Sequence, residues 1–177
     1  TACAATANKC LHGIPGLCFV VSRRKALEYS AEPPRSLYLH LPLWADKQDQ
    51  QGTPFTPSVN GVLALEQALN ELAGQGGWRG RHAHYTQLAG KVKRTLAAKN
   101  VEPLLQPGES SCVLNAYRIP EGRTYGEIHD GLKQRGFVIY AGQGSMVTEM
   151  FRISTMGDIS DYDMERLLAA LHTVFSA

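Results

Sequence analysis

The chain has 177 residues, of which 19% are charged and 44% hydrophobic, and its formal net charge is +2. This length can bury a sizeable core in one domain or one and a half, and the nearly balanced charge argues against a nucleic-acid-binding surface. No apolar run approaches the ~20 residues that a membrane-spanning helix needs, and the first residues lack the basic and apolar regions of a signal peptide.

The cysteines and histidines do not form a metal-binding or disulfide pattern. No CxxC pair occurs among the cysteines at positions 3, 10, 18 and 112. This spacing fits a reducing compartment, so we expect a cytoplasmic protein. His82 and His84 have no neighbouring cysteine or carboxylate partner, and we interpret them as structural or exposed residues of a solvated basic segment, 79–84. A metal site is therefore not predicted.

The first feature of chemical interest is a lysine that precedes a glycine-bracketed loop. Lys9 stands in Ala7-Asn8-Lys9-Cys10, and Gly13-Ile-Pro-Gly16 follows it. The apolar run at 17–21 is typical of a strand that is buried on both faces in a parallel sheet. A lysine held in a semi-dry site can lose its proton near neutral pH and attack a carbonyl. We therefore predict a buried catalytic amine, against the commoner alternative of a solvated surface lysine.

The segment that follows is less regular. Residues 23–28 indicate a short helix, which two consecutive prolines then end. Alternating leucines at 37–41 are compatible with a strand. Residues 46–57 predict a polar and then turn-rich connector that contains Thr53 and Thr56, with a proline near the start of the next helix.

Helical periodicity then dominates up to about residue 99. Apolar residues recur at helical spacing over residues 58–73, and we expect packing to account for this stripe. Glycines within 74–77 interrupt the pattern, which resumes in a second helix.

From residue 101 onward, strands and helices alternate. Strands are predicted at 112–119, 137–140 and 150–153. Thr124-Tyr-Gly-Glu127 is a capping box that starts one helix, and Gly136 is expected to end it. A last helix begins at Ser160-Asp-Tyr-Asp163. Because neighbouring strands are joined both by turns and by a helix, we predict a small α/β sandwich with an antiparallel sheet.

An arginine on one of these strands is the second candidate for chemistry. Strand alternation in Phe151-Arg152-Ile153 puts the two apolar side chains on one face and Arg152 on the other. A guanidinium fixed on a strand can offer a bidentate fork to a carboxylate or phosphonate. The alternative is an arginine on an edge strand that forms a surface ion pair.

Four segments in chain order resemble the 2-aminoethylphosphonate–pyruvate aminotransferases, within the class V branch of the fold-type-I pyridoxal-phosphate (PLP) enzymes. They are residues 7–16, the Thr-Pro segment at 56–57, residues 136–142 and residues 151–157. The resemblance covers essentially the whole chain. One difference is Ser154, which stands where the family usually has glycine and puts the local backbone path in question.

The resemblance implies an α/β fold, namely the C-terminal portion of a fold-type-I PLP-dependent transferase. Residues 1–57 would be the end of the large PLP-binding domain, with part of its mixed sheet, and a connector. Residues 58–99 would be interdomain helices, and 100–177 a small C-terminal α/β domain with an antiparallel sheet. The family's phosphate loop, pyridine-binding aspartate and ring-stacking aromatic all precede the lysine. We therefore expect an incomplete fragment with negligible turnover on its own.

The resemblance also implies roles for individual residues. Lys9 would carry PLP covalently and transfer a proton between the substrate carbon and the cofactor. Asn8, Thr53 and Thr56 would contact the cofactor. Thr56 would do so across the interface of a homodimer, at the phosphate of the PLP bound in the other subunit. Arg152 would bind the acidic group of the substrate. The implied reaction converts 2-aminoethylphosphonate and pyruvate to phosphonoacetaldehyde and alanine, a step of phosphonate degradation.

Two alternatives stay open at this point. Another class V aminotransferase, acting as an alanine–glyoxylate or serine–pyruvate enzyme, would share most of these motifs, although the Asn-Lys-Cys and Gly-Ile-Pro-Gly contexts favour the phosphonate branch. A non-catalytic remnant of the fold would dimerise without taking up PLP.

Overall fold

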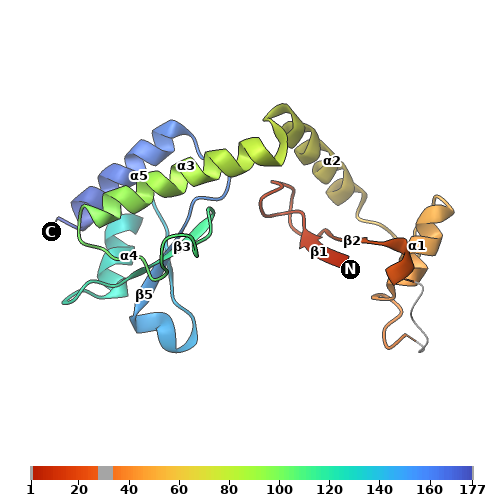
Figure 1. Ribbon diagram of the computed structural model, residues 1–177, viewed down its shortest axis with the longest axis horizontal. Helices are drawn as coiled ribbons and strands as arrows, with labels where there is room; N and C mark the ends of the chain where they lie inside the picture. Colours follow the sequence, from red (N-terminus) through yellow and green to blue (C-terminus); the bar gives the residue numbers. More distant parts are fainter. Residues whose placement is uncertain (1, 28–33, 177) are drawn as a thin grey trace. The chain divides into compact units, whose positions relative to one another are not determined.

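The computed structural model describes residues 2–27 and 34–176, which form two compact units, residues 1–71 and 72–177 (Figure 1). The first contains strands β1 (Ala2–Thr6) and β2 (Cys18–Ser22), a short 3₁₀ helix η1 (Arg24–Ala26) and helix α1 (Leu41–Asp49). Most of helix α2 (Val59–Gly74) also lies in this unit.

Strands β1 and β2 form an antiparallel pair, in which Ala2 lies opposite Ser22 and Thr6 opposite Cys18. The prediction of a parallel strand buried on both faces is therefore wrong. Residues 7–17 return the chain directly from β1 to β2, whereas a parallel pair needs a longer crossover connection. Val20 and Val21 are exposed, so an apolar run alone did not indicate burial here.

The segment around α1 corrects three further predictions. The helix expected at 23–28 is a single 3₁₀ turn at Arg24–Ala26, and the prolines expected to end it lie partly outside the described residues. The leucines at 37–41 form no strand. They lead through a turn into α1, whose first turn contains Pro42, where the missing N–H of proline costs no helical hydrogen bond. Residues 46–49 of the expected connector are therefore helical.

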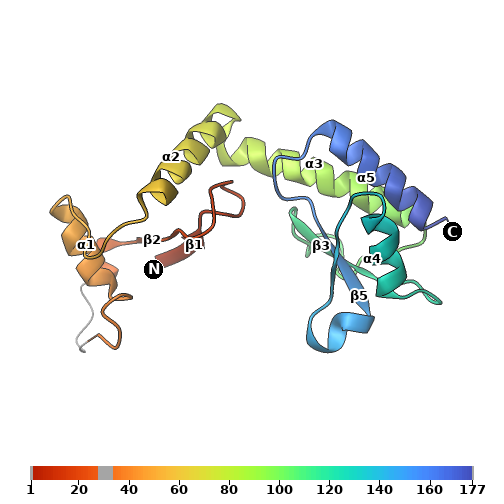
Figure 2. The ribbon, with the colours of Figure 1, turned by 180° about the vertical axis from the view of Figure 1, so that it is seen from behind.

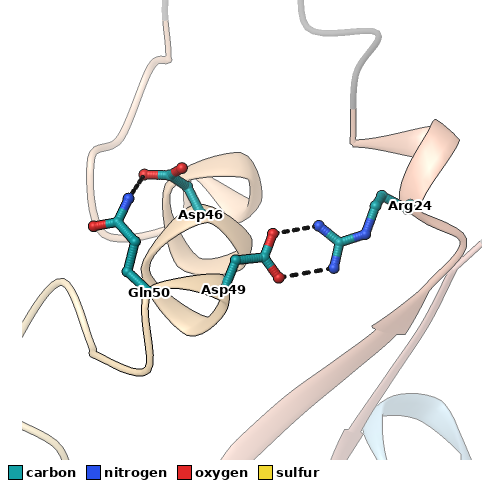
Figure 3. A network of polar contacts seen from close by, with 4 residues as sticks. All are labelled: Arg24, Asp46, Asp49 and Gln50. Atoms are coloured by element: carbon teal, nitrogen blue, oxygen red, sulfur yellow. Dashed lines mark hydrogen bonds and ion pairs between the residues drawn. The ribbon is translucent and has the colours of Figure 1, made fainter.

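A bidentate ion pair joins the chain on either side of residues 28–33. Figure 3 shows the Arg24 guanidinium facing the Asp49 carboxylate, and Arg24 Nη2 lies 2.9 Å from Asp49 Oδ1. The hydrogen bonds from Arg24 lower the pKa of Asp49. Gln50 Nε2 donates to Asp46 Oδ2 at 2.9 Å on the same helix end. Because both partners of the ion pair are exposed, solvent screening limits its contribution to stability.

Helix α2 confirms the helix predicted at 58–73, but its apolar stripe is not covered as expected. Only Gly61 and Ala68 of this helix are buried. Val62 and Leu69 belong to the stripe and are exposed, as are Val59 and Leu63 beside them. A helix with such a face normally buries it against another surface.

The second unit places helices against a three-stranded antiparallel sheet of order β3-β5-β4. Its strands are β3 (Leu114–Arg118), β4 (Tyr140–Ala141) and β5 (Met150–Ser154), and a 3₁₀ helix η2 (Gly144–Thr148) connects the last two. Its helices are α3 (Gly77–Ala97), α4 (Tyr125–Lys133) and α5 (Asp161–Val174). Figures 1 and 2 both show α5 next to α3. The antiparallel sheet is as predicted, although the strand expected at 137–140 is paired only from Tyr140.

One face of this sheet and three helices share the core of the unit. Tyr117 of β3 stacks on Phe151 of β5 with ring centroids 5.6 Å apart. Ile153 of β5 is also buried in this core. The other buried members come from α3, α4, α5 and the connections: Leu88, Val92, Leu96, Val101, Ile128, Leu132, Ile139, Met164, Leu167, Ala170, Leu171 and Val174. Burial raises the pKa of the Tyr117 phenol.

The basic segment at 79–84 is not uniformly solvated as predicted. Arg81 is 6% exposed, and its Nη2 donates to Gln75 Oε1 at 2.6 Å. Helical periodicity explains the burial, since Arg81, Tyr85 and Leu88 follow one another on the buried face of α3.

The predicted capping box of α4 is confirmed in both directions. Glu127 N donates to Thr124 Oγ1 at 3.3 Å, and Thr124 N donates to Glu127 Oε2 at 2.7 Å. The Thr124 hydroxyl also donates to Glu127 Oε2, at 2.9 Å, and the two bonds that this carboxylate accepts from Thr124 lower the pKa of Glu127. Gly136 has φ +89° just after the helix, the left-handed conformation predicted for it.

The lowered pKa of Glu127 makes the stability of α4 depend on pH. A carboxyl group whose pKa is lower in the folded state stabilises the fold above its unfolded pKa, and this contribution is lost as the pH falls through the folded value. We expect Glu127→Gln to be less stable than wild type at pH 7, with the difference disappearing toward pH 3. Urea unfolding followed by far-UV circular dichroism at both pH values measures this. The matched control is Glu165→Gln, at an exposed position of α5, and a wild-type advantage that does not change with pH would contradict the assignment.

Candidate functional site

The segment between β1 and β2, residues 7–17, carries Lys9, and we call it the strap. Backbone hydrogen bonds close it at its base, where Ala7 N donates to the Leu17 carbonyl at 3.0 Å and Gly13 N to the Ala7 carbonyl at 2.9 Å. A third bond, from His12 N to the Lys9 carbonyl at 2.9 Å, forms a tight turn, and His12 has φ +65°. The strap therefore holds Lys9 on a short, closed loop.

Close packing at the base of the strap requires glycine at position 13. Ala7 is fully buried, and a Cβ atom on Gly13 would lie 2.9 Å from Ala7 Cβ and 3.0 Å from the Ala7 carbonyl oxygen. Such distances are shorter than normal van der Waals contact, so a larger residue would push the two chain segments apart. Close packing against Ala7 thus explains why the first residue of the Gly-Ile-Pro-Gly motif is glycine.

Lys9 itself is exposed, and the predicted burial of this amine is wrong for the chain as the structure describes it. Its side chain has no hydrogen-bond or ion-pair partner among residues 2–27 and 34–176. Asn8, directly before it, is half-buried. The backbone fixes the position of the amine, while the amine is left accessible to a ligand.

The end of the strap packs against the beginning of α2. A Cβ atom on Gly61 would lie 3.7 Å from Leu17 Cβ, and Gly61 is one of the two buried residues of this helix. The same added atom would lie 2.9 Å from Ser58 Oγ. A small residue in the first turn of α2 therefore lets the strap approach the N-terminal end of the helix.

The threonine segment before α2 is fixed by an aromatic cluster. Phe55 lies between the two threonines and packs on Tyr38 and Trp44, with ring centroids 5.3 and 5.8 Å away. Trp44 Nε1 donates to the Tyr38 carbonyl at 2.7 Å. Thr53 Oγ1 donates to the Phe55 carbonyl at 2.8 Å, and Thr56 is exposed shortly before the first residue of α2. Sequence reasoning did not predict this cluster, because its rings come from separate segments.

Arg152 lies in the second unit, on the face of β5 opposite Phe151 and Ile153, as predicted. The two apolar side chains are buried, whereas Arg152 is partly exposed. Arg152 Nε donates to the carbonyl oxygen of Ala141 on the neighbouring strand at 2.9 Å. Across the described part of the chain no carboxylate pairs with this guanidinium, so the predicted alternative of a surface ion pair finds no support there.

The serine that differs from the family pattern fits into regular strand pairing. Ser154 lies opposite Leu114, and its hydroxyl donates to the Val113 carbonyl at 3.1 Å. Thr155 N donates to the same carbonyl at 2.9 Å. The backbone path after Arg152 therefore accommodates a side chain at this position.

Other kinds of site find no support in the residues that the structure describes. No group of three or more histidine, cysteine, aspartate or glutamate residues there could hold a metal ion. Within the described residues, Cys3, Cys18 and Cys112 form no disulfide. No helix in the described ranges is both long and apolar enough to cross a bilayer.

Solved structures place the fold in one class of protein. The subgroup IV aspartate aminotransferase of Thermus thermophilus superposes with a TM-score of 0.87 at 28% identity, covering 99% of this chain and 49% of that one. The alanine–glyoxylate aminotransferase of Nostoc sp. gives a TM-score of 0.87 at 18% identity, covering 98% and 47% of the two chains. The predicted fold class is confirmed: the chain has the fold of about half of a class V aminotransferase.

Comparison with curated sequences gives relatives of one named enzyme within this class. The 2-aminoethylphosphonate–pyruvate transaminase of Klebsiella pneumoniae is 36% identical over 171 residues, which is 94% of this chain and 46% of the relative. The enzyme of the same name from Salmonella paratyphi B is 36% identical over 173 residues, or 96% and 47%. The chain thus spans about half the length of these relatives and matches their C-terminal half, which confirms the predicted resemblance. No protein-family profile matches the chain.

The tight base of the strap leads to a test. We expect Gly13→Ala to separate Ala7 from residue 13 and to loosen the turn that holds Lys9. Hydrogen exchange of the Ala7 and residue 13 amides, measured by NMR, should become at least tenfold faster, because both hydrogen bonds at the base are strained. Ser22→Ala, at the far end of β2, is the control. Unchanged protection in the glycine variant would show that the strap does not depend on this contact.

Proposed function

We propose that the protein carrying this chain is a PLP-dependent aminotransferase that uses 2-aminoethylphosphonate as amino donor and pyruvate as acceptor. Its products would be phosphonoacetaldehyde and alanine, a step of phosphonate degradation. The observation that carries this proposal is the match, over 94% of the chain, to an enzyme of that name, together with a lysine on a closed strap. Because the chain spans about half of its relatives, the proposal concerns the whole protein, and we expect little turnover from these residues alone.

The residues of the first unit have the chemistry that PLP requires. An accessible primary amine, with no partner among the described residues, suits a cofactor that carries an aldehyde. Helix α2 begins at Val59, whose amide donates to the Pro57 carbonyl at 3.0 Å. The hydroxyl of Thr56 and the next amides of the first turn form a donor set suited to a phosphate. The donor set present on this chain therefore fits the cofactor.

We assign the roles residue by residue. Lys9 Nζ would hold the cofactor and, when released by the amino donor, would accept a proton from the substrate carbon and deliver it again. Asn8 would restrict the approach of that amine. Thr56 would contact the phosphate of the cofactor in the other subunit, and Thr53, at the neighbouring motif position, would also contact the cofactor. PLP would supply the electron sink that stabilises the carbanion. Arg152 would bind the acidic group of the substrate through its terminal guanidinium nitrogens.

The exposed apolar side chains of α2 support a homodimer as part of the proposal. An uncovered apolar stripe on a helix is favourably buried against a second protein surface. We retain the division into residues 1–57, 58–99 and 100–177 as the functional parts. We place the protein in the cytoplasm, where the thiols of Cys3, Cys18 and Cys112 would stay reduced.

Covalent trapping tests the role of Lys9. We expect PLP followed by borohydride to label Lys9, as mapped by peptide mass spectrometry, with a visible absorption band before reduction. Lys9→Ala should lose the band and the specific label, whereas Lys25→Ala, which removes another exposed lysine, should keep both. Random labelling of surface lysines, unaffected by Lys9→Ala, would contradict the assignment and favour a non-catalytic remnant of the fold.

The amino donor is tested in the complete PLP-loaded protein. We expect alanine to form from pyruvate at least a hundredfold faster with 2-aminoethylphosphonate than with serine, as measured by chromatography. A preference for serine would instead indicate the serine–pyruvate branch of class V.

A further inference from the structure

The pairing of β4 with β5 places a tyrosine directly beside Arg152. Tyr140 is the register partner of Arg152 across the antiparallel pair. Residues that are directly opposite in such a pair have side chains on the same face, with Cβ atoms about 5 Å apart. Tyr140 is 65% exposed, so its ring projects from the sheet on the face away from the core.

The guanidinium is oriented by the same strand pair. Arg152 uses Nε to bind the Ala141 carbonyl, which belongs to the residue after Tyr140. Neither terminal nitrogen has a hydrogen-bond acceptor in the described ranges. The fork is thus fixed at its base, with its two outer nitrogens left to bind an anion.

The other neighbours of the guanidinium leave room for a ligand. On the β3 side, the residue opposite Arg152 is Ala116, whose methyl group is small. On the β4 side, the Tyr125 hydroxyl donates its proton to the carbonyl of Ile139, the residue before Tyr140, at 2.9 Å, so this proton is not available to a ligand. The Tyr140 hydroxyl, in contrast, has no hydrogen-bond partner anywhere in the described part of the chain.

The geometry points to Tyr140 as a specificity-determining residue whose hydroxyl, with the Arg152 fork, selects a phosphonate over a carboxylate. A planar carboxylate offers two oxygens, which a bidentate guanidinium satisfies. A tetrahedral phosphonate offers a third oxygen and more negative charge, and this oxygen needs a further donor. The inference rests on the proposed function in one respect, namely that Arg152 receives the acidic group of the substrate.

Binding of two unreactive analogues tests this without any turnover. Ethylphosphonate and propionate correspond to 2-aminoethylphosphonate and β-alanine without the amine, and NMR titration of the full protein gives their dissociation constants. We expect wild type to bind ethylphosphonate at least tenfold more tightly than propionate. Tyr140→Phe should weaken the binding of ethylphosphonate about tenfold and that of propionate less than twofold, because only the third phosphonate oxygen loses its hydrogen-bond donor. Arg152→Ala should weaken both ligands.

Two controls separate this inference from the proposed function. Tyr162→Phe removes the hydroxyl of another exposed tyrosine, on α5, and should leave both constants unchanged. Equal effects of Tyr140→Phe on the two ligands, or a wild type that does not prefer ethylphosphonate, would overturn the inference. Transamination of 2-aminoethylphosphonate with unchanged selectivity in Tyr140→Phe would leave the proposed function intact and reject the role of Tyr140 alone.

Discussion

The first unit depends on the close contact between Ala7 and Gly13. Two backbone hydrogen bonds at Ala7, one to each side of the strap, keep β1 and β2 together while the residues between them form a loop. This contact fixes the backbone of Lys9 without burying its side chain. The start of α2 packs on the end of the same strap through Gly61, so the lysine-bearing loop and the helix that follows the threonine segment are held in one compact unit.

In the second unit, the sheet positions a charged side chain, that of Arg152. Burial of Phe151 and Ile153 under three helices forces the residue between them to the opposite face, and the Ala141 carbonyl then orients its guanidinium. In both units the apolar packing determines where a charged group emerges, and a backbone contact determines its direction. Neither charged group is neutralised by a neighbour among the described residues, which is the arrangement that binding of a charged or carbonyl-bearing ligand requires.

The sequence predicted correctly the features that depend on a few consecutive residues. The capping box at Thr124, the left-handed Gly136 and the alternation around Arg152 are properties of a few consecutive residues, and the structure confirms them. The antiparallel sheet of the second unit was also predicted correctly, but other predictions that depended on distant surfaces failed. The apolar run of β2 is exposed, and the leucines before Pro42 are not a strand, because pairing and burial depend on partners that periodicity does not identify. For residues 136–142 the sequence predicts a strand and a turn that resemble the family's segment leading to the substrate pocket. The register of Tyr140 against Arg152 is a tertiary property, so the sequence does not predict it.

A chimera tests the role of Lys9 most directly. In it, this chain replaces the C-terminal half of the Klebsiella pneumoniae relative, and alanine formation from pyruvate and 2-aminoethylphosphonate is measured. We expect a folded, PLP-binding chimera that forms alanine, and an otherwise identical Lys9→Ala chimera that does not. A chimera that folds and binds PLP but forms no alanine with this donor, or one whose activity survives Lys9→Ala, would contradict the claim that this chain supplies the catalytic lysine of such an enzyme.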